Sequence, residues 1–247
     1  MGGSSVTPSE LQNQHPDEKR QSDFQNHFWA YLVVRPLSFY IAPVFIRLGF
    51  GATHVTAIGA FVLISGLALF GFGGSLAPLV GGALLINIWY LLDFVDGVVA
   101  RYNDTTTAFG AFLDWFVGVL YHVLLPFAAA AVLYRSDMVS LTEGAGILWF
   151  TIATVEVVFR LVRWLVRYKT EQLIDRNNCV SSTKQGISLG MLAGAVSSFK
   201  APLFLLSVMA GVLDIWLLVY AVYSFGLFTP ELLIYIRRLR RFDQKST

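Results

Sequence analysis

Three aspartates in a predominantly apolar sequence have the type and spacing needed for metal chemistry. Asp93 and Asp96 lie three residues apart, and Asp114 follows near the start of the next apolar stretch. Residues three apart on a helix project from the same face. If a short connection over residues 102–108 joins two antiparallel helices, Asp114 faces the other two. Because carboxylates are costly in apolar surroundings, this arrangement predicts a site at which all three converge.

Three ionised carboxylates at one place repel each other, and a bound divalent cation relieves that repulsion. Oxygen ligands suit hard ions such as Mg²⁺, Ca²⁺ or Mn²⁺. Softer metals are not expected, because no cysteine and only one histidine lie nearby. The alternative is that the aspartates are caps or interface residues at helix ends. That alternative suits one aspartate better than three on adjacent helix ends.

Small residues and one arginine accompany the aspartates. Gly97 and Ala100 keep one helix face thin, so that a ligand or a partner backbone can approach closely. Gly110 is expected to do the same for the facing helix. Arg101 follows directly and is placed to hold a phosphate that bridges to the metal.

The composition determines which environment these residues occupy. Of the 247 residues, 55% are hydrophobic and only 14% are charged, and the mean hydropathy is +0.61. Soluble domains carry about 25% charged residues, so this chain cannot cover a water-exposed surface. This composition excludes a soluble enzyme and a disordered chain. The single cysteine excludes a disulfide scaffold. The net charge of +2 gives no reason to expect a nucleic-acid partner.

Long apolar stretches predict an all-α integral membrane protein with six transmembrane helices. Its expected spans are residues 55–74, 75–92, 115–134 and 145–166, and two more between 185 and 230. With both termini on one side, that side receives every lysine and arginine except Arg135. The positive-inside rule then predicts cytoplasmic termini and an aspartate site at the cytoplasmic face.

The rest of the chain is divided into three parts. Residues 1–24 are polar and lack the apolar core of a signal peptide, so we expect a disordered tail. Residues 25–47 mix aromatic residues with arginines and prolines, which predicts a cytoplasmic interfacial amphipathic segment. A single membrane domain is expected over 25–240, and residues 241–247 form a short C-terminal tail.

The motif Asp-x2-Asp-Gly-x2-Ala-Arg-x8-Gly-x3-Asp over residues 93–114 resembles the signature of the CDP-alcohol phosphotransferase family at seven fixed positions. Members of that family transfer a substituted phosphate from a CDP-linked donor, usually CDP-diacylglycerol, to an alcohol and release CMP. The resemblance implies that Asp93, Asp96 and Asp114 bind metal, with two Mg²⁺ or Mn²⁺ ions expected. It also implies that Gly97, Ala100, Arg101 and Gly110 shape or contact the CDP site. A homodimer is implied in the same way.

The sequence departs from the family pattern at Gly118, where the family has a fourth aspartate that is thought to deprotonate the acceptor hydroxyl. His122 is the nearby candidate for a substitute base, because residues 114, 118 and 122 share a helix face. Along the helix, however, His122 lies about 12 Å beyond Asp114. The other interpretation is a buried histidine paired with a hydroxyl or a backbone carbonyl.

A second group of charged residues recurs along the fourth span, at Glu156, Arg160, Arg163 and Arg167. Glu156 is expected deep in the membrane, so an ion pair with Arg160 is its predicted state. Arg160 and Arg163 are the predicted contacts for an anionic acceptor, whereas Arg167 fits plain cytoplasmic anchoring equally well. Weaker additions to this pocket are Ser181, Ser182, Thr183, Lys184 and Lys200.

The predicted function is therefore metal-dependent transfer of a phosphatidyl group in phospholipid biosynthesis, at a pocket open to the cytoplasm and to the lipid bilayer. Two alternatives stay open. One is a family relative that binds a CDP-lipid without catalysis, which Gly118 suggests. The other is a small ion-coupled transporter, which would need its acidic cluster near mid-membrane. The sequence does not identify the acceptor alcohol.

Overall fold

The computed structural model describes residues 6–13, 16, 20–21, 23–24, 27–135, 146–176, 194 and 196–246. Within these ranges the chain forms helices and no strand. The elements are α1 (Pro8–Asn13), the π-helical turn η1 (Ala30–Val34), α3 (Arg35–Arg47), α4 (Ala52–Phe72), α5 (Leu76–Tyr102), α6 (Ala108–Arg135), α7 (Gly146–Arg176), α9 (Lys200–Ala210) and α10 (Leu213–Ser246).

The described part of the chain contains five helices that are long and apolar enough to cross a membrane. They cover Ala30–Arg47, Ala52–Phe72, Leu76–Tyr102, Ala108–Arg135 and Leu213–Arg240. The all-α membrane class is thus confirmed. The count of six stays a prediction, because α7 is 31 residues long but carries several charges and α9 has only 11 residues.

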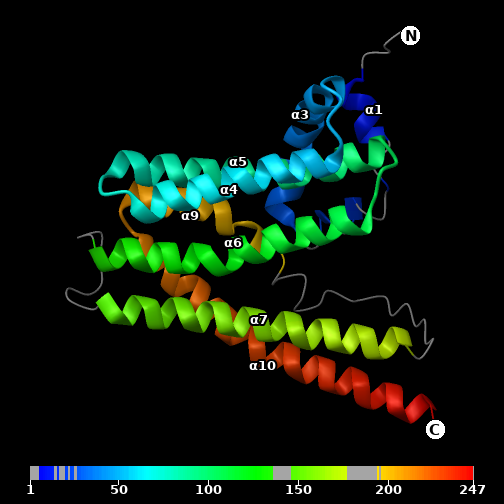
Figure 1. Cartoon of the computed structure of the whole chain (residues 1–247). Coiled ribbons are helices and arrows are strands. Elements are labelled where there is room, and N and C mark those ends of the chain that lie inside the picture. Colours follow the sequence, from blue (N-terminus) through cyan, green and yellow to red (C-terminus); the bar gives the residue numbers. More distant parts are fainter. Residues whose placement is uncertain are drawn as a thin grey trace.

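The long helices run alongside one another, with α4 against α5 and α6, and α7 against α6 and α10 (Figure 1). The shorter α9 packs on α5 and α10. Helices α4 and α5 approach closely where two glycines face each other. A Cβ on Gly82 would lie 2.6 Å from the Gly66 carbonyl oxygen. Small residues permit such backbone approach between membrane helices.

The N-terminal segment lies at one end of the α4–α5 pair, where α1 and α3 meet (Figure 1). In α1, Leu11 is buried in a cluster that includes Phe39, Val55 and Val95. Residues Pro8–Asn13 are thus described as a helix that contacts α3, and the disordered tail over residues 1–24 as a whole stays a prediction. Residues 30–47 are helical, and their interfacial position stays a prediction.

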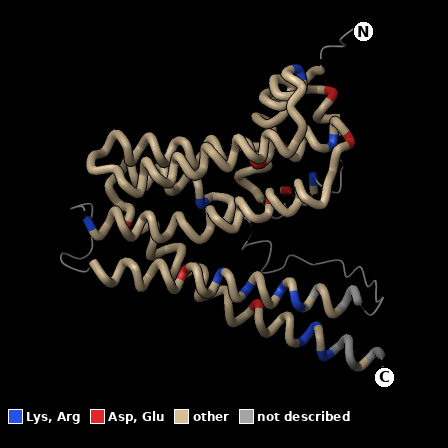
Figure 2. Tube along the Cα trace, in the orientation of Figure 1, with Lys and Arg blue, Asp and Glu red and all other residues tan. Residues whose placement is uncertain are grey.

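Charged residues are distributed unevenly along the bundle (Figure 2). Most of the coloured positions lie toward the end that carries α1 and the C-terminal part of α10. The opposite end, where α6 terminates, carries the basic residue Arg135. This distribution has the asymmetry that the positive-inside rule describes.

Candidate active site

A cavity of about 360 Å³ lies where α5, α6, the N-terminal segment and the start of α9 meet. Most of the residues singled out from the sequence line it together. They are Asp93, Asp96, Gly97, Arg101, Asp114, Gly118 and His122. The structure thus brings both halves of the motif to one place, although they belong to different helices.

The turn between α5 and α6 produces this convergence. Helix α5 ends at Tyr102 and α6 begins at Ala108, which agrees with the expected short connection. Within the turn, Asp104 adopts a left-handed conformation with φ of 50°. The Thr107 hydroxyl then accepts a hydrogen bond from the Gly110 N–H at 3.0 Å, as an N-terminal cap does. The chain therefore reverses at once, and α6 returns beside the aspartates.

The three motif aspartates differ in exposure. Asp96 is buried, Asp93 is partly buried and Asp114 is exposed. The Thr56 hydroxyl of α4 donates to Asp96 Oδ2 at 2.7 Å, and Asp93 and Asp114 line the same cavity. Side-by-side carboxylates repel when both are ionised, so this part of the cavity favours a cation.

The donor set fits a hard divalent cation in kind, because every candidate ligand is a carboxylate oxygen. In the ranges that the structure describes, no three histidine, cysteine or acidic side chains are close enough to hold one ion as they stand. Holding metal would therefore require side-chain adjustment by Asp93, Asp96 and Asp114.

Arg101 contributes a hydrogen-bond donor without a protein partner. Its Nη2 atom is buried and makes no hydrogen bond within the described residues. A Cβ on Gly97 would lie 3.5 Å from the same guanidinium, an ordinary van der Waals contact. A buried unpaired donor is costly, which makes an anionic ligand the natural partner for Arg101.

Two of the motif residues do not line the cavity. Ala100 lies on α5, where its carbonyl accepts a hydrogen bond from the Thr105 N–H at 3.1 Å. Gly110 lies against the start of α4, and a Cβ there would be 3.5 Å from the Thr53 hydroxyl, an ordinary van der Waals contact. Contact of Ala100 and Gly110 with the CDP-linked donor therefore stays a prediction.

Gly118 and His122 occupy successive turns of α6 along the cavity wall. No described atom lies within 4 Å of the position that a Cβ on Gly118 would take. His122 packs on Tyr121 and Trp164, with ring centroids 4.8 and 5.3 Å away. Its Nδ1 atom is buried without a hydrogen-bond partner in the described chain. His122 therefore reaches the aspartate cavity despite its distance along the helix.

Asp23 and Arg35 also line the cavity and were not identified from the sequence. They form a buried ion pair in which Arg35 Nη2 lies 2.7 Å from Asp23 Oδ2. The Arg35 guanidinium also lies over the Phe94 ring, 4.6 Å from its centroid. The sequence feature that could have indicated this part of the cavity is Arg35 itself, a single charged residue within the apolar stretch VVRPLSF. From the sequence, Arg35 counts only toward the membrane orientation.

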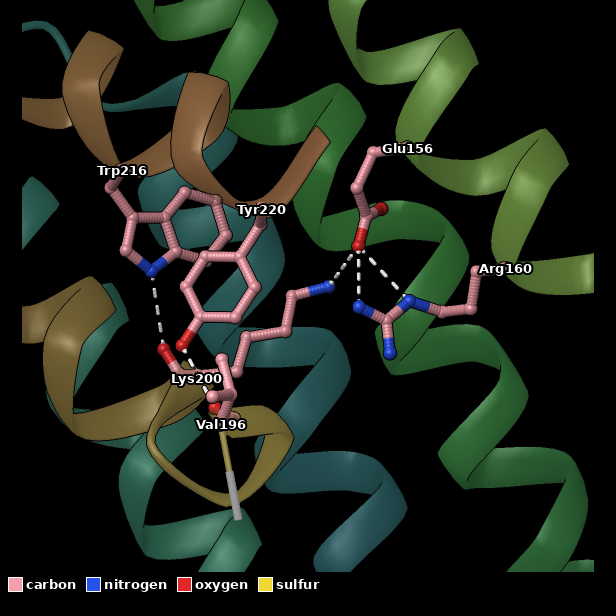
Figure 3. A network of polar contacts seen from close by, with 6 residues as sticks. All are labelled: Glu156, Arg160, Val196, Lys200, Trp216 and Tyr220. Carbon is pink, nitrogen blue, oxygen red and sulfur yellow. Dashed lines mark hydrogen bonds and ion pairs between the residues drawn. The ribbon is translucent and has the colours of Figure 1, made fainter. Parts of the chain in front are cut away.

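The predicted Glu156–Arg160 ion pair is confirmed, and Lys200 completes it (Figure 3). Arg160 Nη2 and Lys200 Nζ lie 2.8 and 2.9 Å from the same oxygen, Glu156 Oε1. Figure 3 shows the Lys200 and Arg160 side chains reaching that oxygen next to each other, Lys200 from α9 and Arg160 from α7. Lys200 Nζ also lies 5.6 to 5.8 Å from the ring centroids of Tyr121, Trp216 and Tyr220.

The two predicted acceptor residues therefore have acidic neighbours already. Arg160 pairs with Glu156, and Arg163 Nε lies 3.2 Å from Glu231 Oε2. Neither arginine lines the aspartate cavity, so acceptor binding by them stays a prediction. Four of the weaker candidates, Ser181, Ser182, Thr183 and Lys184, lie outside the described residues.

The sequence profile of the CDP-alcohol phosphatidyltransferase family matches residues 40–229. The match covers most of the chain, including the whole motif and helices α4 to α9. No curated protein matches the chain.

Proposed function

The chain belongs to the CDP-alcohol phosphatidyltransferase family, and from this premise we propose that it transfers a phosphatidyl group from CDP-diacylglycerol to an alcohol acceptor in phospholipid synthesis. The observation that carries the proposal is the meeting of Asp93, Asp96, Asp114 and Arg101 in one cavity. A family of transferases gives no support to the ion-coupled transporter.

In the proposed reaction the acceptor hydroxyl oxygen forms a bond to the β-phosphorus of the donor. The bond from that phosphorus to the CMP oxygen breaks, and CMP leaves with the electron pair. Asp93, Asp96 and Asp114 would hold two Mg²⁺ or Mn²⁺ ions, which supply charge neutralisation for the pyrophosphate when bound. Arg101 donates to a phosphate oxygen through Nη2, the nitrogen that has no partner in the described part of the chain.

His122 is the proposed base, because the family's fourth aspartate is replaced by Gly118. Its Nδ1 atom has no described partner and belongs to a side chain that lines the same cavity. A neutral imidazole with an open nitrogen can accept the proton of the acceptor hydroxyl. Proton transfer by a positioned side chain contributes about 10²–10⁴-fold to the rate.

The site is proposed to face the cytoplasm, where most of the basic residues would lie. Arg160 and Arg163 keep the proposed role of contacts for an anionic acceptor, which would require them to exchange their glutamate partners. A homodimer is also proposed on the family's precedent alone.

The test measures metal-dependent CMP release by purified full-length protein with CDP-diacylglycerol and a panel of alcohols. We expect His122→Gln to lower kcat by about 10²-fold or more. We expect Gly118→Asp to restore activity in the His122→Gln background, because the space at residue 118 is open. Full activity of His122→Gln would refute His122 as the base.

Gly118 also favours a second candidate, a relative that binds a CDP-lipid without turning it over. That candidate predicts CMP binding by the wild type without CMP release. It further predicts that Gly118→Asp binds nucleotide and stays inactive with every acceptor. Release of CMP by the wild type would eliminate it.

A further inference from the structure

The N-terminal segment, here the described residues from Asp23 to Arg35, supplies part of the cavity wall, although it lies far ahead of the motif in the sequence. Asp23, His27 and Arg35 line the cavity beside the motif aspartates. The same segment is held to the other wall near α9, where the Trp29 N–H donates to Ser198 Oγ at 3.2 Å. The Trp29 and Phe199 rings also pack with centroids 5.5 Å apart. The segment therefore spans the cavity from α5 to α9.

Arg35 is buried in the cavity wall and does not lie on the protein surface. Only 7% of its surface is exposed, and its guanidinium lies over Phe94, between the motif residues Asp93 and Asp96 in sequence. Arg101 lines the same cavity, and its buried Nη2 has no hydrogen-bond partner among the described residues. Two guanidinium groups on one cavity wall are suited to a group with several anionic oxygens, such as a phosphate.

Asp23 occupies the place on Arg35 that such an oxygen would take. Arg35 Nε and Nη2 lie 2.9 and 2.7 Å from one carboxylate oxygen, Asp23 Oδ2. A phosphate offers separate oxygens to the two nitrogens, which is the stronger bidentate geometry. The Asp23 carboxylate, which is 1% exposed, also adds negative charge to a wall that already carries three aspartates.

We propose that Arg35 binds the α-phosphate of the CDP-linked donor, the phosphate that leaves with CMP, and that Asp23 holds this guanidinium until the phosphate replaces it. The inference rests on the proposed function and extends the donor site beyond the motif, to a segment that the family signature does not include. Asp23 is thus a competitor of the donor, and its carboxylate lowers donor affinity.

The experiment measures the Kd of CMP for the full-length protein in nanodiscs with Mg²⁺ present. Arg35→Gln is expected to weaken CMP binding about tenfold, which is the size of a charge-assisted hydrogen bond. Asp23→Asn is expected to tighten it about threefold, since the guanidinium is released while an amide keeps the shape. The double variant is expected to bind CMP nearly as weakly as Arg35→Gln, because most of the gain in Asp23→Asn comes from the release of Arg35.

Arg47→Gln is the matched control. Arg47 lies on the same helix, and its Nη2 donates to the Val6 carbonyl at 3.2 Å outside the cavity. Its CMP affinity is expected to equal that of the wild type. Should Arg35→Gln fail to fold, Arg35→Lys keeps the charge beside Asp23 and loses the fork. It is expected to weaken binding about threefold.

Two results would overturn the inference while leaving the proposed function intact. Unchanged CMP affinity in folded Arg35→Gln and Arg35→Lys would show that Arg35 does not contact the phosphate. Weaker binding in Asp23→Asn would show that Asp23 orients Arg35 and does not compete with the ligand. By contrast, CMP binding without CMP release from CDP-diacylglycerol would refute the proposed activity and leave the Arg35 result valid.

Discussion

In the buried cluster of Glu156, Arg160 and Lys200, we predict that loss of the negative charge destabilises the protein more than loss of one positive charge. One carboxylate oxygen serves both cations, at 2.8 and 2.9 Å, and all three side chains are almost fully buried. At an effective dielectric constant of about 20, each contact contributes roughly 6 kcal/mol of gross attraction. Most of that gain is offset by desolvation, so what matters is which charge a substitution leaves without a partner.

Glu156→Gln leaves two buried cations facing a neutral amide. Removing one partner of a buried ion pair costs about 3–5 kcal/mol, and we expect the upper part of that range because two cations lose their counter-ion. Lys200→Met instead leaves the Glu156–Arg160 pair intact. The substitution removes one ionic contact and the three aromatic contacts of Nζ. We expect it to lower the free energy of unfolding by about 1–2 kcal/mol.

The measurement is the free energy of unfolding of purified protein in mixed micelles, followed by tryptophan fluorescence and circular dichroism. The double variant Glu156→Gln/Lys200→Met is expected to be more stable than Glu156→Gln, because it removes one of the stranded cations. If Lys200→Met costs as much as Glu156→Gln, or if the double variant is the least stable of the three, the electrostatic reasoning is refuted.

Three further predictions concern the cavity and the helix contacts that support it. Chelation with EDTA should abolish CMP release, and added Mg²⁺ should restore it; activity that survives chelation would contradict the metal-site proposal. Thr56→Val should lower kcat about tenfold or less with little change in KM, because it removes the 2.7 Å hydrogen bond that orients Asp96; an equal rise in KM would contradict this positioning role. Gly82→Ala should lower the free energy of unfolding by about 1–3 kcal/mol, since its Cβ would collide with α4. Gly226→Ala, at a helical position with open space around the new Cβ, should leave stability unchanged or raise it. Equal effects of the two glycine substitutions would contradict the close α4–α5 contact.

Local sequence patterns were enough to predict the long apolar helices and the grouping of Asp93, Asp96 and Asp114. Uninterrupted apolar stretches predicted the membrane helices, because crossing hydrocarbon requires a length and a composition that are readable along the chain. The spacing of Asp93, Asp96 and Asp114 indicated one converging group, since it depends on helix periodicity and one short turn. Glu156 and Arg160 were predicted to pair for the same reason, being four residues apart.

Contacts between distant segments could not be predicted in this way. Lys200 joins Glu156 across 44 residues of sequence, and basic residues near membrane ends carry no signal that distinguishes anchoring from a buried ion pair. The polar N-terminal segment was interpreted as a disordered tail, yet Asp23 is buried against Arg35. Composition reports the average solvation of a segment and does not reveal which single side chain finds a partner elsewhere.

His122 illustrates the division between sequence and structure. The sequence alone established its helix face and its rise above Asp114, and that distance argued against contact between His122 and the aspartates. The cavity extends along α6, however, from Asp114 to His122, and Tyr121, Ser198 and Ala201 also line it. The sequence thus determined which residues carry charge in an apolar chain and which neighbours share a helix face. Only the tertiary structure decided which of them meet, because that depends on how α4, α5, α6 and α9 pack on one another.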